Sequence, residues 1–541
     1  MAGSERTQKT EYLLTGLVLL VLAAYLLVFG FVDFRGFPRL ATSDMYEDTL
    51  CARLMWEAKS LFPKRFLFGN QFYVIATPVL AALFYGLTGS MNTGMALATT
   101  VMSLLILLSM DWMLRPALKK PWQRLAALLG FVGLFIGAGI RSEDGPQLFF
   151  VMCSFYACYV ITNFVVLGDY ARARLSAKRR IPALILACFL CFCTGMQSLR
   201  QTCVTILPLL CFEALGVIRR LCRREPVFPS DRRPVFLRVG VYTLANILGV
   251  VFIRLLPLRQ HTIYRGASLL NGSSLREELV ETGRALSAVT GLDFVMGQYG
   301  SWFSLLLFLF CMTLIAAAIV FLLRDRKAAF DDAAFFWLLS VIACAAAIAA
   351  AFFTAVSLRP VYLFPYYTLP ALSYVILVRR MKPGHAKVLS AVLALFAAAN
   401  LYLGYRYDVQ AVTSPDPTTP EKVCQFAMDH GYRYVYGNAS HTSPIIAVYS
   451  DGALIAGGWD DEIIFKLTPY INIRDIYSLS DYKDAVFVFL PSEMPRVMIE
   501  TEGNGAELTF QGEFGEYLVY TSSKQLLYPI TETIDYNPEY N

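Results

Sequence analysis

The acidic side chains with the best spacing for catalysis follow the first long apolar run of the chain. The run covers residues 12–32, and Asp44, Glu47 and Asp48 come shortly after it. A carboxylate within hydrogen-bond reach of an acceptor hydroxyl can take its proton while the hydroxyl oxygen attacks a carbon centre. Asp44 and Glu47 also have the spacing of a helix capping box, so Asp44 has a purely structural interpretation as well.

Arginine and tyrosine side chains near the ends of later apolar runs are suited to a phosphate ligand. Arg200 lies in a polar interruption between two runs, Arg265 lies in a later loop, and Arg359 and Tyr362 open another run. The planar guanidinium group can form paired hydrogen bonds to phosphate oxygens. Snorkelling to lipid headgroups is the alternative interpretation of Arg200, and anchoring at the membrane interface is the alternative for Arg359.

The composition places these residues in a multi-pass membrane protein. Of the 541 residues, 56% are hydrophobic and 16% are charged, and the mean hydropathy is +0.51. An ordinary soluble domain carries roughly 25% charged residues, so a soluble enzyme and a disordered protein are both excluded. Runs of about 20 apolar residues are long enough to cross the hydrocarbon core. Eleven such spans are predicted, at residues 12–32, 94–114, 122–140, 148–168, 181–195, 203–218, 239–256, 301–323, 333–356, 361–378 and 388–404.

A twelfth apolar segment, residues 72–88, contains Pro78 and is interpreted as a juxtamembrane segment that does not cross. If it crossed, all the strongly basic loops would face outward, against the positive-inside rule. If it does not cross, the N-terminus and these loops are cytoplasmic, and the first outer loop covers residues 33–92. The basic loops in question are residues 115–124, 172–180, 219–233, 324–327 and 379–387.

The last part of the chain, residues 405–541, is predicted to be a small extracytoplasmic α/β domain. It holds 8 Lys and Arg against 20 Asp and Glu, whereas residues 1–404 hold 39 against 21. The basic excess therefore belongs to loops between spans, and nucleic acid is not an expected partner. Pro420 favours a helix over residues 421–430. Strand-like runs rich in Val, Tyr and Phe occur at residues 432–436, 485–490, 507–510 and 517–521.

The order of these parts resembles the GT-C superfamily, the membrane glycosyltransferases that use polyprenyl-phosphate donors, including the dolichyl-phosphate-mannose–protein mannosyltransferase-like family. In that superfamily the first outer loop carries an acid, an aromatic residue, a helix and a Pro-containing apolar segment. The matching parts here are Asp44, Tyr46, residues 50–62 and residues 72–88. The acid and arginine of the second outer loop correspond to Arg141, Glu143 and Asp144, and the late Arg/Tyr/Pro cluster corresponds to Arg359, Pro360 and Tyr362.

The resemblance implies an all-α polytopic membrane protein, with about 11 transmembrane helices, outer juxtamembrane helices and the small α/β domain. It also implies transfer of a sugar from a polyprenyl-phosphate carrier to an envelope glycan, lipid or protein acceptor at the outer face of the plasma membrane. Asp44 is the first candidate for the base. Glu143 and Asp144 are further candidate acids, and Arg141, Arg200, Arg265, Arg359 and Tyr362 are candidate phosphate ligands.

Metal involvement and two other functions remain open at this level. No spacing assigns a metal site, although Glu143 and Asp144 could help to hold a divalent cation. A transporter or flippase of a lipid-linked envelope precursor would carry ionisable residues near the middle of the bilayer, where the spans have almost none. A non-catalytic scaffold whose outer domain recruits envelope partners is the other alternative.

Overall fold

The computed structural model describes residues 2–68, 71–135, 156–175, 181–227, 229, 232–258, 275–296, 301–324, 334–354, 358–459, 463–466 and 481–528. The chain divides into two compact units, each of which is described by itself. The first unit comprises Met1–Gly30, Val101–Ile253 and Gly266–Val409. The second comprises Phe31–Thr100, Arg254–Arg265 and Gln410–Asn541, so it combines the predicted first outer loop with the tail.

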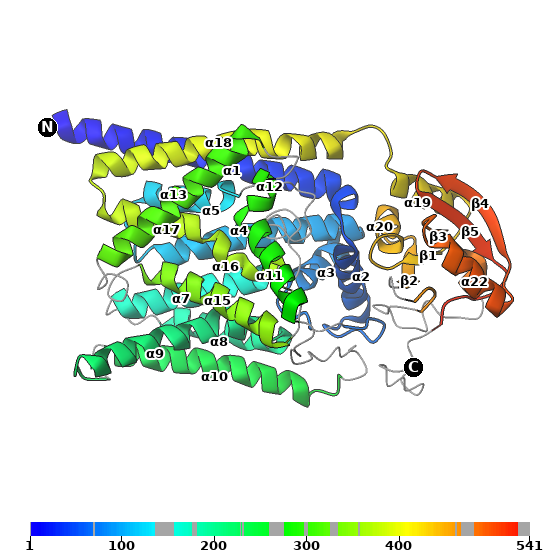
Figure 1. Cartoon of the computed structure of the whole chain (residues 1–541), viewed down its shortest axis with the longest axis horizontal. Helices are drawn as coiled ribbons and strands as arrows, with labels where there is room; N and C mark the ends of the chain where they lie inside the picture. Colours follow the sequence, from blue (N-terminus) through cyan, green and yellow to red (C-terminus); the bar gives the residue numbers. More distant parts are fainter. Residues whose placement is uncertain are drawn as a thin grey trace. The chain divides into compact units, whose positions relative to one another are not determined.

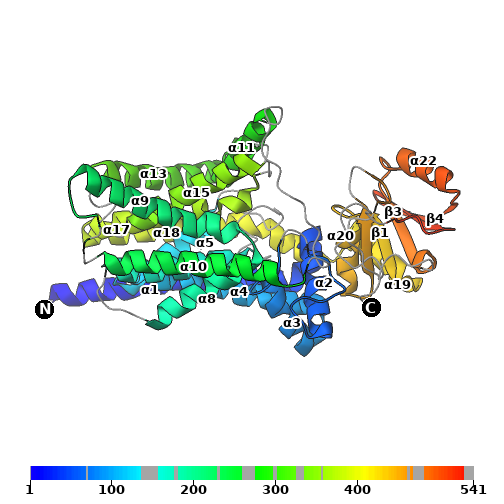
Figure 2. The same cartoon turned by 90° about the horizontal axis from the view of Figure 1, so that it is seen from below.

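The first unit is helical, and most of its helices run lengthwise side by side (Figures 1 and 2). Its described helices of ten residues or more, including those shared with the second unit, are α1 (Ala2–Leu40), α4 (Met91–Leu114), α5 (Pro121–Gly133), α7 (Ala157–Leu175), α8 (Ile181–Gln197), α9 (Leu207–Cys222), α10 (Arg233–Leu255), α11 (Leu275–Thr290), α13 (Trp302–Arg324), α15 (Phe335–Thr354), α17 (Leu369–Arg380) and α18 (Pro383–Thr413). A 3-10 turn, η3 (Pro360–Leu363), and the short helix α16 (Phe364–Tyr367) precede α17.

Among the described residues, 8 helices are long and apolar enough to cross a membrane. All 8 overlap predicted spans. Of the three other predicted spans, residues 181–195 form α8, a helix of 17 residues. Residues 122–140 and 148–168 are only partly described, as α5 and α7. The prediction of a polytopic helical protein is therefore confirmed, while the count of eleven spans stays a prediction.

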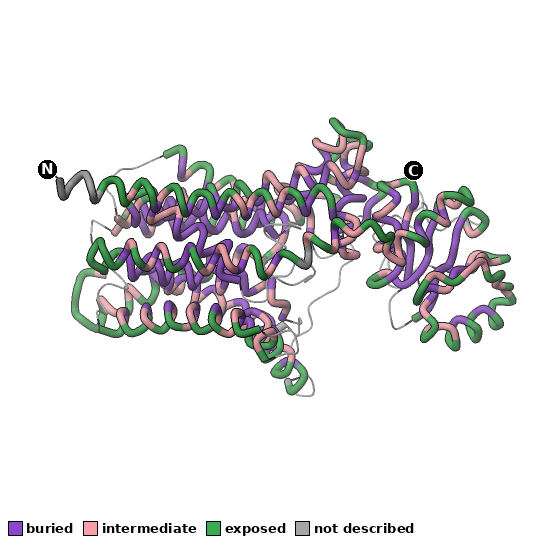
Figure 3. The backbone as a smooth tube through the Cα atoms, turned by 90° about the horizontal axis from the view of Figure 1, so that it is seen from above, coloured by how far each residue is buried: buried purple, intermediate pink, exposed green. Residues whose placement is uncertain are grey.

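Burial distinguishes a central helix from peripheral ones. In the segment Pro360–Arg380, which ends with α17, 89% of the most apolar window is buried, against 28% in α13. The peripheral helices carry exposed apolar faces, which Figure 3 shows as exposed sides of the tube. On α10 that face includes Leu244, Leu248 and Leu255. Exposed apolar faces of this size suit contact with lipid chains rather than water.

Ion pairs bring three predicted cytoplasmic segments to one end of the first unit. Lys120, just before α5, and Lys387, at the start of α18, lie 2.6 Å and 3.4 Å from the Glu11 carboxylate of α1. Glu11 and Lys120 therefore lie at the same end of the first unit, and the two helices between them that are long and apolar enough to cross a membrane are α1 and α4. Helix α3 (Thr77–Thr88) has 12 residues, about 18 Å, which is too short to cross. The juxtamembrane placement of residues 72–88 stays a prediction.

Helix α2 (Ser43–Ala58) and α3 form the loop part of the second unit. Helix α2 begins seven residues before the predicted helix at residues 50–62 and ends four residues before its end. It ends at Ala58 because Lys59 takes a left-handed backbone conformation that stops the helix. Edge-to-face contacts of Phe62 with Phe68 and Phe72, and of Phe68 with Tyr73, order the segment between the two helices.

The tail contains a five-stranded sheet of order β2-β1-β3-β5-β4. Its strands are β1 (Tyr434–Asn438), β2 (Ile455–Trp459), β3 (Ala485–Phe489), β4 (Leu508–Phe514) and β5 (Tyr517–Ser522). Strands β1, β2 and β3 pair in parallel, whereas β5 pairs antiparallel with β3 and β4. Its helices include α19 (Thr419–Asp429), α20 (Ser443–Ala447) and α22 (Met494–Asn504). The predicted small α/β domain is confirmed, and β2 and α22 are additions to it.

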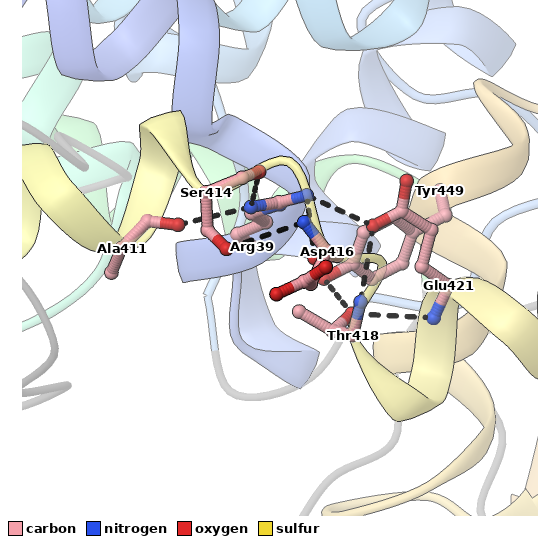
Figure 4. Close-up of polar contacts among 7 residues, drawn as sticks. All are labelled: Arg39, Ala411, Ser414, Asp416, Thr418, Glu421 and Tyr449. Atoms are coloured by element: carbon pink, nitrogen blue, oxygen red, sulfur yellow. Dashed lines mark hydrogen bonds and ion pairs between the residues drawn. The ribbon is translucent and has the colours of Figure 1, made fainter.

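Arg39 joins the end of α1 to the start of the tail (Figure 4). Its guanidinium group donates hydrogen bonds to the carbonyl oxygens of Ala411 (3.0 Å) and Ser414 (2.8 Å), at the end of α18. It also pairs with the Glu421 carboxylate at 3.3 Å, and Glu421 forms a capping box with Thr418 at the start of α19. A cation at the carboxyl end of a helix stabilises the helix dipole, so Arg39 fixes this junction by charge as well as by hydrogen bonding.

Candidate functional site

Asp44 lies in the first turn of α2 and does not cap the helix. The cap is Thr42, whose extended backbone conformation (φ −100°, ψ 173°) lets its hydroxyl accept a hydrogen bond from the Met45 amide at 3.4 Å. The purely structural interpretation of Asp44 as the capping residue is therefore wrong. Asp44 is half-buried.

The two other acids of this segment lie on the same side of α2 as Asp44, at helical spacings of three and four residues. Burial raises the pKa of the Glu47 carboxyl well above its usual range, and the charges of Asp44 and Asp48 raise it further. Burial also raises the pKa of the Asp48 carboxyl well above its usual range. A hydrogen bond from Tyr73 lowers this pKa, but by less than burial raises it. Glu47 and Asp48 therefore hold their protons more tightly than ordinary carboxyls, and Asp44 is left as the preferred candidate for the base.

Replacing Asp48 with asparagine is expected to stabilise the protein more at pH 8 than at pH 5. The raised pKa means that the folded state binds the proton of Asp48 more tightly than the unfolded chain, whose Asp pKa is about 3.9. Stability is therefore lost as the pH rises above that unfolded value, until the folded group also ionises. The neutral amide removes this loss, which thermal unfolding at the two pH values will measure. Equal changes at both pH values would contradict the assignment, and the exposed Glu57→Gln is the control.

The structure brings Arg200 together with Tyr362, two residues that were predicted independently as phosphate ligands. The guanidinium carbon of Arg200 lies 5.2 Å from the centre of the Tyr362 ring and 5.0 Å from that of Tyr156. The two rings are themselves 6.2 Å apart. Both rings attract the cation and hold it between two helical segments of the first unit.

Arg359 is the residue before η3, one turn ahead of Tyr362. Its carbonyl oxygen accepts a hydrogen bond from the Tyr362 amide at 3.0 Å, and its backbone is extended (φ −88°, ψ 145°). Pro360 follows it and fixes the start of the turn. The turn thereby places Arg359 in the segment that supplies the Tyr362 ring to Arg200, which gives the first unit two arginines around one short turn.

The remaining predicted site residues lie outside the described part of the chain. These are Arg141, Glu143, Asp144 and Arg265. Their roles stay predictions. Asp44 belongs to the second unit, whereas Arg200, Arg359 and Tyr362 belong to the first.

Two buried ion pairs were missed from the sequence. Asp169 of α7 is fully buried and accepts hydrogen bonds from Arg238 and Tyr242 of α10, with the Arg238 contact 2.9 Å long. Glu213 of α9 pairs with Arg174 of α7 at 2.8 Å. Breaking such a pair leaves an uncompensated buried charge. The sequence signal that could have revealed them is opposite charges near the ends of neighbouring spans. These ion pairs join helices to one another and do not form a catalytic site.

No group of three or more His, Cys, Asp or Glu side chains in the described residues is arranged to hold a metal ion. Glu143 and Asp144, the pair that the sequence suggests for a divalent cation, lie outside those residues.

The structure is similar to that of ArnT from Cupriavidus metallidurans. With ArnT bound to undecaprenyl phosphate, the TM-score is 0.52 at 15% sequence identity, over 95% of this chain and 99% of that one. With the apo state of ArnT the TM-score is 0.51 at 15% identity, over the same shares of the chains. An oligosaccharyltransferase from Archaeoglobus fulgidus, tethered to an acceptor peptide, gives 0.44 at 10% identity, over 94% of this chain and 74% of that one.

No protein-family model and no curated protein matches the chain. The match to ArnT extends over nearly the whole of both chains, including the helical membrane part and the small α/β domain. The chain therefore has the fold of ArnT over nearly its whole length.

Proposed function

We propose that this protein is a membrane glycosyltransferase that transfers a sugar from a polyprenyl-phosphate donor to a hydroxyl group of an envelope glycan, lipid or protein. The observation that carries the proposal is Arg200, held between the rings of Tyr156 and Tyr362 beside the turn that bears Arg359. The ArnT structure of the same fold contains undecaprenyl phosphate, a ligand of the proposed donor class.

In the proposed reaction, the acceptor oxygen attacks the anomeric carbon of the donor sugar. The bond from that carbon to the phosphate oxygen breaks, and polyprenyl phosphate leaves with the bonding electrons. Asp44 takes the acceptor proton as general base. The Arg200 and Arg359 guanidinium groups stabilise the negative charge that develops on the leaving phosphate. Glu143 and Asp144 are further candidate acids, and Arg141 and Arg265 are further candidate phosphate ligands.

Transfer from a radiolabelled polyprenyl-phosphate sugar by the purified protein is the direct test. The expected result is release of polyprenyl phosphate together with a labelled product when a membrane or envelope extract supplies the acceptor. A panel of donors that differ in the sugar will identify the preferred one. Absence of turnover and of donor binding across the whole panel would overturn the proposal.

We further propose that the N-terminus faces the cytoplasm and that the tail is extracytoplasmic, in the plasma membrane. Lys119, in the basic loop beside Lys120, is then cytoplasmic. A single cysteine at this position, Lys119→Cys in a background without other accessible cysteines, should react with an impermeant thiol reagent only after the cells are permeabilised. A cysteine in the tail, His430→Cys, should react in intact cells. The reverse pattern would show the opposite orientation.

A further inference from the structure

Strand β2 is one edge of the tail sheet, and a helix of the first outer loop bonds one of its outward-facing backbone amides. Ile455 donates its amide hydrogen to the Arg433 carbonyl oxygen on the β1 side at 2.9 Å. Because successive residues of a strand alternate in direction, the Ala456 amide points away from β1. An edge amide of this kind is a free donor unless another part of the protein accepts its hydrogen.

The acceptor is the Tyr46 hydroxyl of α2. It lies 2.9 Å from the Ala456 nitrogen, and Tyr46 is 3% exposed. Burial raises the pKa of Tyr46 to about 12, so the hydroxyl is uncharged at neutral pH. Tyr46 comes two residues after Asp44, in the same part of α2. Its ring therefore fixes the amino-terminal turns of α2 against the edge of the sheet.

Three further hydrogen bonds, from two residues, join the loop helices to the same part of the tail. Arg53, two turns along α2, donates to the Gly452 carbonyl oxygen at 2.8 Å. Asn92, at the start of α4, donates its side-chain amide to the Val448 carbonyl oxygen at 2.9 Å and its backbone amide to the Asp451 carboxylate at 2.8 Å. Together with Tyr46, these residues dock α2 and the start of α4 on residues 448–456, which form a turn and the first part of β2.

We infer that the α/β tail is a positioning element for Asp44, and that Tyr46 is the positioning residue that transmits its hold to the first turn of α2. The inference rests on the proposed function in one respect only, the role of Asp44 as the base. The tail then acts on the rate of transfer through the position of Asp44 and needs no contact of its own with donor or acceptor. A base displaced by about 1 Å can lower the rate roughly a hundredfold.

The test is Tyr46→Phe, which keeps the ring and removes only the hydroxyl that accepts the Ala456 hydrogen. Hydrogen exchange of the full-length protein in detergent is expected to become faster across residues 43–58. The value of kcat should fall roughly tenfold to a hundredfold while KM for the polyprenyl-phosphate sugar stays unchanged. A split of this kind separates positioning of the base from binding of the donor.

Tyr517→Phe is the matched control, because Tyr517 is also a buried tyrosine with a hydrogen bond to the backbone; its hydroxyl donates to the His441 carbonyl oxygen at 3.5 Å. It should change neither the exchange of α2 nor kcat. Unchanged exchange of α2 in Tyr46→Phe, unchanged kcat despite faster exchange, or an equal loss in the control would each overturn the inference. If the wild type transfers no sugar, the proposed function fails, and the exchange of α2 alone decides whether Tyr46 holds the helix.

Discussion

Replacing Asp44 with asparagine is expected to lower the rate of sugar transfer by roughly 10²–10⁴-fold, the range that loss of a general base produces. The change is nearly isosteric, and it leaves the helix cap intact because Thr42, not Asp44, caps α2. Folding and donor binding should therefore be retained. The measurement is single-turnover transfer from a labelled donor, with binding of the donor measured separately.

Glu57→Gln is the control for this prediction. Glu57 lies on the same helix, is exposed, and pairs with Arg53 at the surface at 2.7 Å. Exposed ion pairs contribute about 1 kcal/mol or less to the free energy of folding. Neutralising Glu57 should therefore leave the fold of α2, and with it the rate of transfer, nearly unchanged. If Asp44→Asn folds, binds donor and turns over near the wild-type rate, Asp44 is not the base, and Glu47 and Glu143 are the next acids to test.

Replacing Arg200 with alanine is expected to weaken donor binding and to lower kcat/KM by roughly 10²–10³-fold, because a preorganised donor to the developing phosphate charge is lost. Arg200→Lys should restore part of the activity, since it keeps the charge but not the planar group that can bond two phosphate oxygens. Both quantities are measured with the same polyprenyl-phosphate sugar, against polyprenyl phosphate alone as competitor.

Arg284→Ala is the matched control. Arg284 lies on α11 of the same unit, is 73% exposed and pairs with Glu281 within one turn at 2.6 Å. Its removal takes away one arginine without altering the Arg200 cluster. An equal loss in both alanine variants would indicate a general effect of surface charge. Full activity of Arg200→Ala would remove this arginine from the phosphate site.

The membrane spans were predictable because their signal is local. A run of about 20 apolar residues identifies a span without knowledge of its neighbours, and all 8 described spans that meet this criterion were found. Strands β1, β3, β4 and β5 were found for a similar reason, since Val, Tyr and Phe favour strands.

Strand β2 was missed because Gly457 and Gly458 resemble a turn in the sequence. The structure needs glycine at position 458, where a Cβ atom would collide with the Gly437 carbonyl oxygen of β1. This requirement comes from the neighbouring strand, so no local pattern reveals it. The sequence also suggested Asp44 rather than Thr42 as the cap of α2, because the capping geometry of Thr42 depends on its backbone angles.

The candidate site was predictable as a set of residue types but not as an arrangement. Arg200 and Tyr362 were each selected for phosphate binding, yet the contact between them joins segments far apart in the chain. The tail's hold on α2 was not anticipated, because a backbone amide of β2 and a hydroxyl of the first loop carry no sequence signal for each other. Long-range hydrogen bonds of this kind appear only in three dimensions.

The contacts of Arg39 with the tail can form only late in the synthesis of the chain. Arg39 and its acceptor Ser414 are 375 residues apart, so the ribosome makes the second long after the first. At about 5–20 residues per second, this interval lasts about 20–75 s. Throughout this interval, the nascent chain carries helix α2 without the residues of the tail that dock it. A chain that ends before Ala411 would therefore lack both the carbonyl oxygens that Arg39 bonds and the edge strand that Tyr46 contacts.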